Sequence, residues 1–130
     1  MSRERTLAFM SDLCRRDHAA LEKWFIDSSV LWMPPTAPVT GGRRIVVLFR
    51  TIFRMYTDLN WKVTELFEVS PTKCIYLTDS WGTIGKDTPY KNSIMTLIEF
   101  NADGKIVFLS DYFKDTAIFE AGKKTSSTAQ

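Results

Sequence analysis

Apolar side chains in the first half of the chain recur at helical spacing. Residues 3–16 carry one such stripe, residues 21–25 a shorter one, and residues 43–56 a wide one. The wide stripe consists of Ile45, Leu48, Phe49, Ile52, Phe53 and Tyr56. Thr40 or Gly41 can cap the start of this third helix. Before it, 28-SSVLWMPP is typical of a short strand that ends in prolines, and 35-PTAPVTGG is typical of a loop.

From residue 61 the period of the apolar positions changes to two. The pattern predicts four strands, over 61–69, 74–84, 90–100 and 105–113, with 101-NADG as a tight hairpin. Helices followed by a run of antiparallel strands indicate an α+β fold, with the helices packed on one face of a curved sheet and a pocket at its open end. The polar segment 121–130 is expected to be a disordered tail, so residues 1–120 are predicted to form one domain.

Alternate residues of a strand share a face, so the mainly apolar set of each strand is expected to face the helices and the pocket. The four sets are Val63, Glu65, Phe67 and Val69; Ile75, Leu77, Asp79 and Trp81; Asn92, Ile94, Thr96 and Ile98; and Val107, Leu109, Asp111 and Phe113. The opposite face would then carry Tyr76, Met95, Leu97 and Phe108, which suggests a covered outer surface.

Asp111 is unusual because it shares its predicted face with three apolar residues. A carboxylate in such a place must find partners, shift its pKa or take part in chemistry. If Glu65 and Asp79 reach the same cavity, the charges repel, so one carboxyl holds a proton while another stays ionised. That is the condition for an acid and a base in one site.

Each of these carboxylates also has a structural interpretation. Asp111 could simply accept hydrogen bonds, Asp79 could pair with Lys91 across the strands, and Glu65 could face water if a bulge turned it outward. Trp32 and Trp81 are expected to be walls of the pocket that suit a flat, hydrophobic substrate.

Composition narrows the classes of function. The 17 Lys and Arg against 15 Asp and Glu give a net charge of +2 without a dense basic run, which argues against nucleic acid or an acidic membrane as partners. Two cysteines without C-x-x-C spacing and a single His argue against a metal site. No segment is typical of a signal peptide or a membrane span, so we expect a cytoplasmic protein with reduced thiols and no cofactor.

The order of elements and three motifs, 33-MPPTAPVTGG, 100-FNADGKI and 110-SDYFKDTAIFEA, resemble the nuclear transport factor-like superfamily of α+β cone folds. The likeness runs from about Leu7 to Glu120 and is closest to the limonene-epoxide hydrolases and the SnoaL-like polyketide cyclases. It implies a cone-shaped α+β barrel with a central pocket and a homodimer through the outer sheet face. The Asp of a D-Y-F sequence at this place is the general acid or base in those enzymes, and that role falls on Asp111.

Other positions of the family differ in this chain. Where the hydrolases carry an Arg-x-Asp pair, this chain has Asp79 and Trp81, and Val30 and Trp32 stand where the hydrolases have water-binding Tyr and Asn. The sheet His of the cyclases has no counterpart.

The sequence therefore predicts cofactor-independent acid–base chemistry, such as cyclisation, isomerisation, dehydration or epoxide opening, on a small polyketide- or terpenoid-like molecule. The expected catalytic residues are Asp111, Asp79 and Glu65. The expected substrate-binding residues are Trp32, Trp81, Asn92, Thr96, Leu77, Leu109, Phe113 and Phe53. The alternative is a non-catalytic module of the same fold that binds a small molecule or dimerises.

Overall fold

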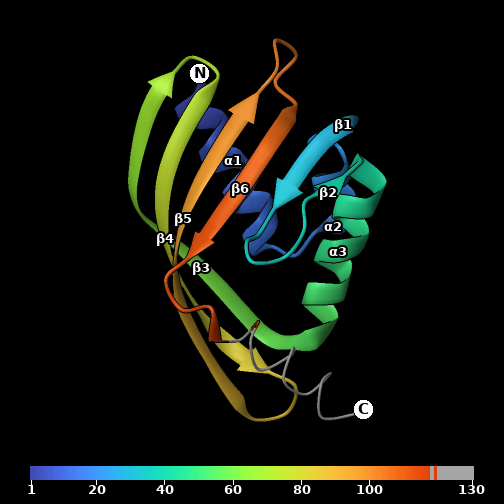
Figure 1. Ribbon diagram of the computed structural model, residues 1–130, viewed down its shortest axis with the longest axis vertical. Helices are drawn as coiled ribbons and strands as arrows, with labels where there is room; N and C mark the ends of the chain where they lie inside the picture. The colour runs from blue at the N-terminus through green and yellow to red at the C-terminus, as the bar shows by residue number, and fades with distance from the viewer. Residues whose placement is uncertain (118, 120–130) are drawn as a thin grey trace.

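The computed structural model describes residues 1–117 and 119 (Figure 1). Its elements are α1 (Ser2–Cys14), α2 (His18–Glu22), β1 (Phe25–Trp32), β2 (Val39–Thr40), α3 (Gly42–Met55), β3 (Tyr56–Ser70), β4 (Lys73–Ile84), β5 (Thr88–Phe100) and β6 (Ile106–Phe113). The predicted order of helices and strands is confirmed, with the short strand β2 added. The predicted tail lies outside the described residues, so the domain boundary at residue 120 stays a prediction. In the described part of the chain, no helix is both long enough and apolar enough to cross a membrane.

One curved sheet carries the fold, with the strand order β2-β1-β6-β5-β4-β3. Neighbouring strands are antiparallel except β1 and β6, which run parallel. Helix α1 contacts β3, β4 and β5, whereas α3 packs against β1 and the start of β3 (Figure 1). The structure is α+β, as the sequence predicts, because the helices bury their apolar stripes against one face of the sheet.

Helix α3 leads directly into β3 without a loop. The helix starts after Gly41, one of the two predicted caps, and ends at Met55. Tyr56 then has extended dihedral angles, φ −103° and ψ 112°, and is already paired with Ile84. The guanidinium of Arg16 donates to the main-chain carbonyls of Phe53 and Tyr56, which stabilises this junction. Tyr56, predicted as the last residue of the helix, is therefore the first residue of a long strand.

A bulge in β3 decides which way its side chains point. The register shifts between Val63 and Glu65, so that Val63 lies opposite Thr78 and Glu65 lies opposite Leu77. The extra residue turns Glu65 to the outer side of the sheet, where it is exposed. The predicted inner set of this strand is therefore wrong beyond Val63, and Phe67 is 52% exposed.

The two faces of β4 are the reverse of the predicted ones. Its buried side chains are Cys74, Tyr76, Thr78 and Ser80, and the alternate residues Ile75, Leu77, Asp79 and Trp81 point outward. The outer set is the more apolar of the two, so choosing the inner face by hydrophobicity fails on this strand. On β5 the predicted inner set is correct, since Asn92, Ile94, Thr96 and Ile98 are all buried.

Aromatic side chains close the narrow end of the cone. Phe9 of α1 packs edge-on against Trp24, at 5.9 Å between ring centroids, and against Phe25, at 6.0 Å. Leu31, Ile98 and other fully buried side chains continue this core. The helices and the sheet diverge beyond this core, and the space between them is the cavity described below.

The main chain of β3 passes very close to Gly82 of β4. A Cβ atom on Gly82 would lie 2.0 Å from the carbonyl oxygen of Asp58, far inside van der Waals contact. We expect Gly82→Ala to lower the free energy of unfolding by roughly 3 kcal/mol, because two backbones must separate to admit the methyl group.

Urea denaturation measures this effect, and Gly85→Ala is the matched control. Gly85 has a φ of +63° but nothing within 4 Å of an added Cβ, so that only the conformational cost of about 1 kcal/mol applies. Equal losses in the two variants would contradict the close approach at Gly82.

Candidate functional site

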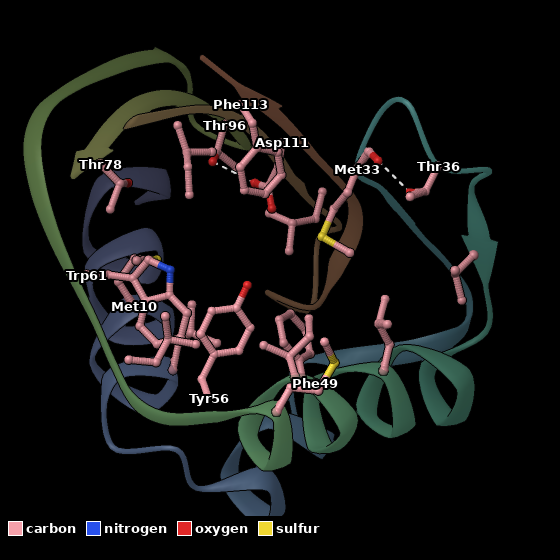
Figure 2. A pocket seen from close by; sticks show the side chains of 18 of the residues that line it. Met10, Met33, Thr36, Phe49, Tyr56, Trp61, Thr78, Thr96, Asp111 and Phe113 are labelled. Carbon is pink, nitrogen blue, oxygen red and sulfur yellow. Dashed lines mark hydrogen bonds between the residues drawn. The ribbon is translucent and has the colours of Figure 1, made fainter. Parts of the chain in front are cut away.

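A cavity of about 370 Å³ lies between α1, α3 and the inner face of β3–β6 (Figure 2). Its volume falls in the range typical of pockets for small organic molecules. Most of the wall is apolar, with Phe9, Met10, Leu48, Phe49 and Ile52 supplied by the helices. The side chains on the wall that carry a polar group are Thr36, Tyr56, Trp61, Tyr76, Thr78, Tyr90, Thr96 and Asp111.

Three of these polar side chains form a row across the sheet. Tyr76 of β4 lies opposite Thr96 of β5, and Thr96 lies opposite Asp111 of β6. Residues in direct register on one face are close neighbours. The Thr96 hydroxyl donates a hydrogen bond of 2.7 Å to Oδ1 of Asp111 (Figure 2).

The Asp111 carboxyl points into the cavity with Thr96 as its hydrogen-bond donor (Figure 2). Burial raises its pKa to about 6, and the hydrogen bond from Thr96 opposes the rise only in part. Both protonation states are therefore populated close to neutral pH, which is what a residue that both accepts and returns a proton requires.

Three tyrosines of the wall remain phenols at neutral pH. Burial raises the pKa of Tyr56 to about 12, with Tyr90 adding to the effect. Burial, and then the negative charge of Asp111, raise the pKa of Tyr76 well above its ordinary value. Burial also raises the pKa of Tyr90. All three hydroxyls can therefore donate hydrogen bonds.

The hydroxyl of Tyr56 is the one placed to meet a ligand. Figure 2 shows it pointing into the hollow, toward the side on which Asp111 lies. Its ring is held edge-on against Tyr90, with 5.1 Å between centroids. The Tyr76 hydroxyl is already engaged, since it donates to Sδ of Met10 at 3.5 Å. A carboxyl group and a phenol donor thus border one apolar space.

Four of the predicted site residues line this cavity, namely Asp111, Thr96, Leu109 and Phe113. Asn92 is buried, but its side chain is used elsewhere. Its amide donates to the Asp115 carbonyl at 2.9 Å and accepts from the Asp115 N–H at 3.1 Å. Asn92 therefore fixes the segment after β6 and is not a wall of the cavity.

The remaining predicted site residues lie elsewhere. The outer face of β4 carries Leu77, Asp79 and Trp81. Asp79 accepts a hydrogen bond of 3.2 Å from the Ser93 hydroxyl. Glu65 is turned outward by the bulge in β3. Trp32 is 37% exposed and donates through Nε1 to the Thr36 carbonyl.

Phe53 does not line the cavity either. It stacks on Phe49 and carries the Arg16 guanidinium over its ring. The prediction of several carboxylates in one cavity is wrong, since Asp111 is the only one that lines it among the described residues.

The structure adds functional candidates that the sequence analysis missed. Tyr76 and Thr78 belong to the alternation of β4 that the sequence assigns to the outer face, and Tyr56 ends the predicted helical stripe. Trp61 and Tyr90 stand near predicted strand starts, where aromatic residues are common at any surface. The usable signal was the second alternation of β4, in which Tyr76, Thr78 and Ser80 are all able to form hydrogen bonds. Within residues 1–117 and 119, no group of three His, Cys, Asp or Glu side chains is arranged to hold a metal ion.

Comparison with known proteins supports the fold. No family model matches the chain, and no curated protein matches its sequence. Among solved structures, an NTF2-like protein of unknown function from Burkholderia pseudomallei has a TM-score of 0.79 at 15% identity, covering 91% of this chain and 93% of that one.

Two further solved structures carry functional names. A putative SnoaL-like polyketide cyclase from Shewanella putrefaciens has a TM-score of 0.76 at 11% identity, covering 86% of this chain and 79% of that chain. An LEH-like epoxide hydrolase from M. tuberculosis has a TM-score of 0.71 at 21% identity, covering 85% and 80%. At these identities the likeness shows the fold: this chain has the NTF2-like α+β cone fold that its sequence motifs predict.

Proposed function

We propose that the protein is a cofactor-independent, cytoplasmic enzyme that moves a proton at a carbon atom next to a carbonyl group in a small, mostly hydrophobic molecule. In carbonyl compounds with an α C–H bond, isomerisation of a double bond, aldol-type cyclisation and loss of a β-hydroxyl group as water can each begin with such a step. The observation that carries the proposal is the Asp111 carboxyl, with a pKa of about 6, on the wall of an apolar cavity. Free thiols at Cys14 and Cys74 fit a reducing compartment.

The geometry supports distinct roles for two groups. The ionised Asp111 carboxylate would accept the proton from carbon and later return it to a different atom of the substrate. The Tyr56 phenol would donate a hydrogen bond to the carbonyl oxygen as negative charge develops there. Thr96 is a positioning residue, because its hydrogen bond orients Asp111 and tunes its pKa.

This arrangement favours enolisation over epoxide hydrolysis. Hydrolysis by the route of the epoxide hydrolases requires groups that hold an attacking water. Among the described residues of the cavity wall there is no Arg, no Asn and no carboxyl other than Asp111. With a single carboxyl group on the wall, a reaction that needs one acid–base residue fits better than one that needs two or three.

A binding module without turnover is the second candidate. This candidate is favoured by the isolation of Asp111, which has no second carboxyl group beside it on the described wall of the cavity and already has Thr96 as a hydrogen-bond partner. The two candidates differ in whether the bound molecule is chemically changed before it is released. An unchanged hydrophobic molecule extracted from the purified protein and identified by mass spectrometry supports the binder, whereas a substrate converted by the protein supports the enzyme.

We also propose a homodimer formed through the outer face of the sheet. Trp81 is 44% exposed and Met95 is 45% exposed. Leu77 lies directly opposite Met95 on the same face, and Asp79 separates Leu77 from Trp81 along β4. On β4 this face is more apolar than the inner one. Apolar groups gathered on one sheet face are typical of an interaction surface.

The first prediction from the proposed function concerns catalytic activity. We expect Asp111→Asn to lower the rate of deuterium exchange at the α-carbon of enolisable ketones by 100-fold or more, in line with the roughly 10²–10⁴-fold contribution of general acid–base residues. NMR in D₂O measures this rate. Asp79→Asn, a change of the same kind on the outer face, should keep the wild-type rate. Normal exchange in the Asp111 variant would remove the proposal.

The second prediction concerns pH and stability. The pKa of Asp111 is raised from 3.8 to about 6 in the folded protein, so its ionisation disfavours folding. The cost is complete above about pH 6 and disappears as the pH falls toward 4. We therefore expect Asp111→Asn to raise the free energy of unfolding at pH 7.5 by up to about 3 kcal/mol, and to change it little at pH 4.

Chemical denaturation at the two pH values measures this difference, and NMR titration of the Asp111 carboxyl gives the pKa directly. Thr96→Val should raise that pKa further, since it removes the hydrogen bond that lowers it. A carboxyl that titrates near 4 in the wild-type protein would contradict the assigned environment.

The third prediction concerns assembly. We expect light scattering to give the mass of a dimer for the wild-type protein, and the mass of a monomer for Met95→Glu, which places a charge on the outer face. Leu7→Glu makes the same change of charge at an apolar residue of α1 that is 43% exposed and lies away from the outer sheet face, so it should leave the mass unchanged. A monomeric wild-type protein at micromolar concentration would exclude the dimer.

A further inference from the structure

The cavity has a second polar site, which lies away from Asp111. Thr78 of β4 lines the cavity and is only 3% exposed, and its hydroxyl has no hydrogen-bond partner among the described residues. Buried hydroxyl groups in folded proteins nearly always have a partner. Figure 2 shows the Thr78 side chain at the edge of the hollow, so the missing partner can be an atom of a bound molecule.

Trp61 supplies a donor next to this hydroxyl. Thr78 lies opposite Val63, and Trp61 lies opposite Ser80, so Trp61 and Thr78 are diagonal neighbours on the inner face of β3 and β4. Figure 2 shows the indole nitrogen of Trp61 bordering the same hollow. An indole N–H can only donate, whereas a threonine hydroxyl can donate or accept. A hydroxyl group on a ligand would satisfy both groups, since its oxygen accepts from the Trp61 N–H and its O–H donates to the Thr78 oxygen.

The site at Trp61 and Thr78 is too far from Asp111 for a single ligand atom to contact both Thr78 and Asp111. Thr78 and Asp111 are separated by β5 and by one step of two residues along the strands, since Thr78 is opposite Ile94 and Ile94 is opposite Phe113. With strands about 5 Å apart and about 3.3 Å per residue, their Cα atoms lie on the order of 10 Å apart. Ile94 and Phe113, both on the cavity wall, are the apolar surface between them.

Resting on the proposed function, we infer that the substrate carries two oxygen functions at opposite ends of a flat apolar body. The enolisable carbonyl lies at Asp111 and Tyr56, and a hydroxyl group lies at Trp61 and Thr78. The substrate class is therefore a hydroxylated cyclic ketone of about two fused rings, rather than a hydrocarbon-like terpenoid. A substrate without the distant hydroxyl leaves the buried Thr78 hydroxyl unpaired, and sites built this way discriminate strongly against the analogue that lacks the group.

The test uses α-tetralone and the hydroxy-α-tetralone whose phenol is at the end opposite the ketone. Dissociation constants are measured by calorimetry on the Asp111→Asn variant, so that binding is observed without turnover. We expect the hydroxylated ketone to bind at least about tenfold more tightly, in line with the typical contribution of such hydrogen bonds. Adding Thr78→Val or Trp61→Phe should reduce this preference several-fold.

Thr36→Val is the matched control. Thr36 also lines the cavity, but its hydroxyl donates to the Met33 carbonyl, so its loss should leave the preference unchanged. A second measurement needs no ligand. Thr78→Val in the otherwise wild-type protein should keep or raise the thermal midpoint of unfolding, because no hydrogen bond is lost, whereas a structural role for the hydroxyl would lower it.

The inference is overturned if neither ketone binds, if both bind equally, or if the preference survives in Thr78→Val. The inference rests on the proposed function, but the two fail in distinguishable ways. Failure of the proposed function appears as the absence of α-proton exchange by the wild-type protein, with the binding preference intact. Failure of this inference appears as equal binding of the two ketones, with exchange intact.

Discussion

A carboxyl group held away from water is the constraint on which this structure depends. Burying Asp111 is unfavourable, and one hydrogen bond from Thr96 compensates only part of the cost, as the raised pKa shows. The surrounding fold must therefore be stable enough to keep the carboxyl in place. The aromatic core around Phe9, Trp24 and Phe25 and the long β3–β4–β5 sheet supply that stability. Such a local cost, tolerated by the rest of the molecule, is typical of functional sites.

The inner face of the sheet serves two purposes along its length. Toward the narrow end, side chains such as Cys74 and Ile98 pack in the core with the helices. One step further along the strands, Tyr76, Thr96 and Asp111 occupy the same face but line the cavity. The change from packing to polar lining takes place because α1 and α3 diverge from the sheet there. The cavity is thus a direct consequence of how the helices sit on a curved sheet, and polar residues are tolerated only where this space begins.

Close backbone contacts hold the other wall of the cavity in place. Tyr56 is fixed by the direct passage from α3 into β3, by the bonds that Arg16 makes to the carbonyls of this junction, and by its contact with Tyr90. Gly82 lets the main chain of β3 lie against β4 at Asp58. These contacts set the position of the Tyr56 phenol relative to Asp111, and hence whether one ligand can meet both.

The sequence by itself determined the order of the elements, the α+β class and the importance of Asp111, because helical and strand periodicities are local properties of the chain. It also identified Thr96, Leu109 and Phe113, because the inner faces that it assigned to these positions of β5 and β6 are the observed ones. It did not determine the faces of β4, because both are apolar enough to be buried, and it did not locate the bulge that turns Glu65 outward. Only the tertiary structure decided that Tyr56, Trp61, Tyr76 and Thr78 share a cavity with Asp111, since they lie on β3, β4 and β6, whose positions and register are set by long-range pairing.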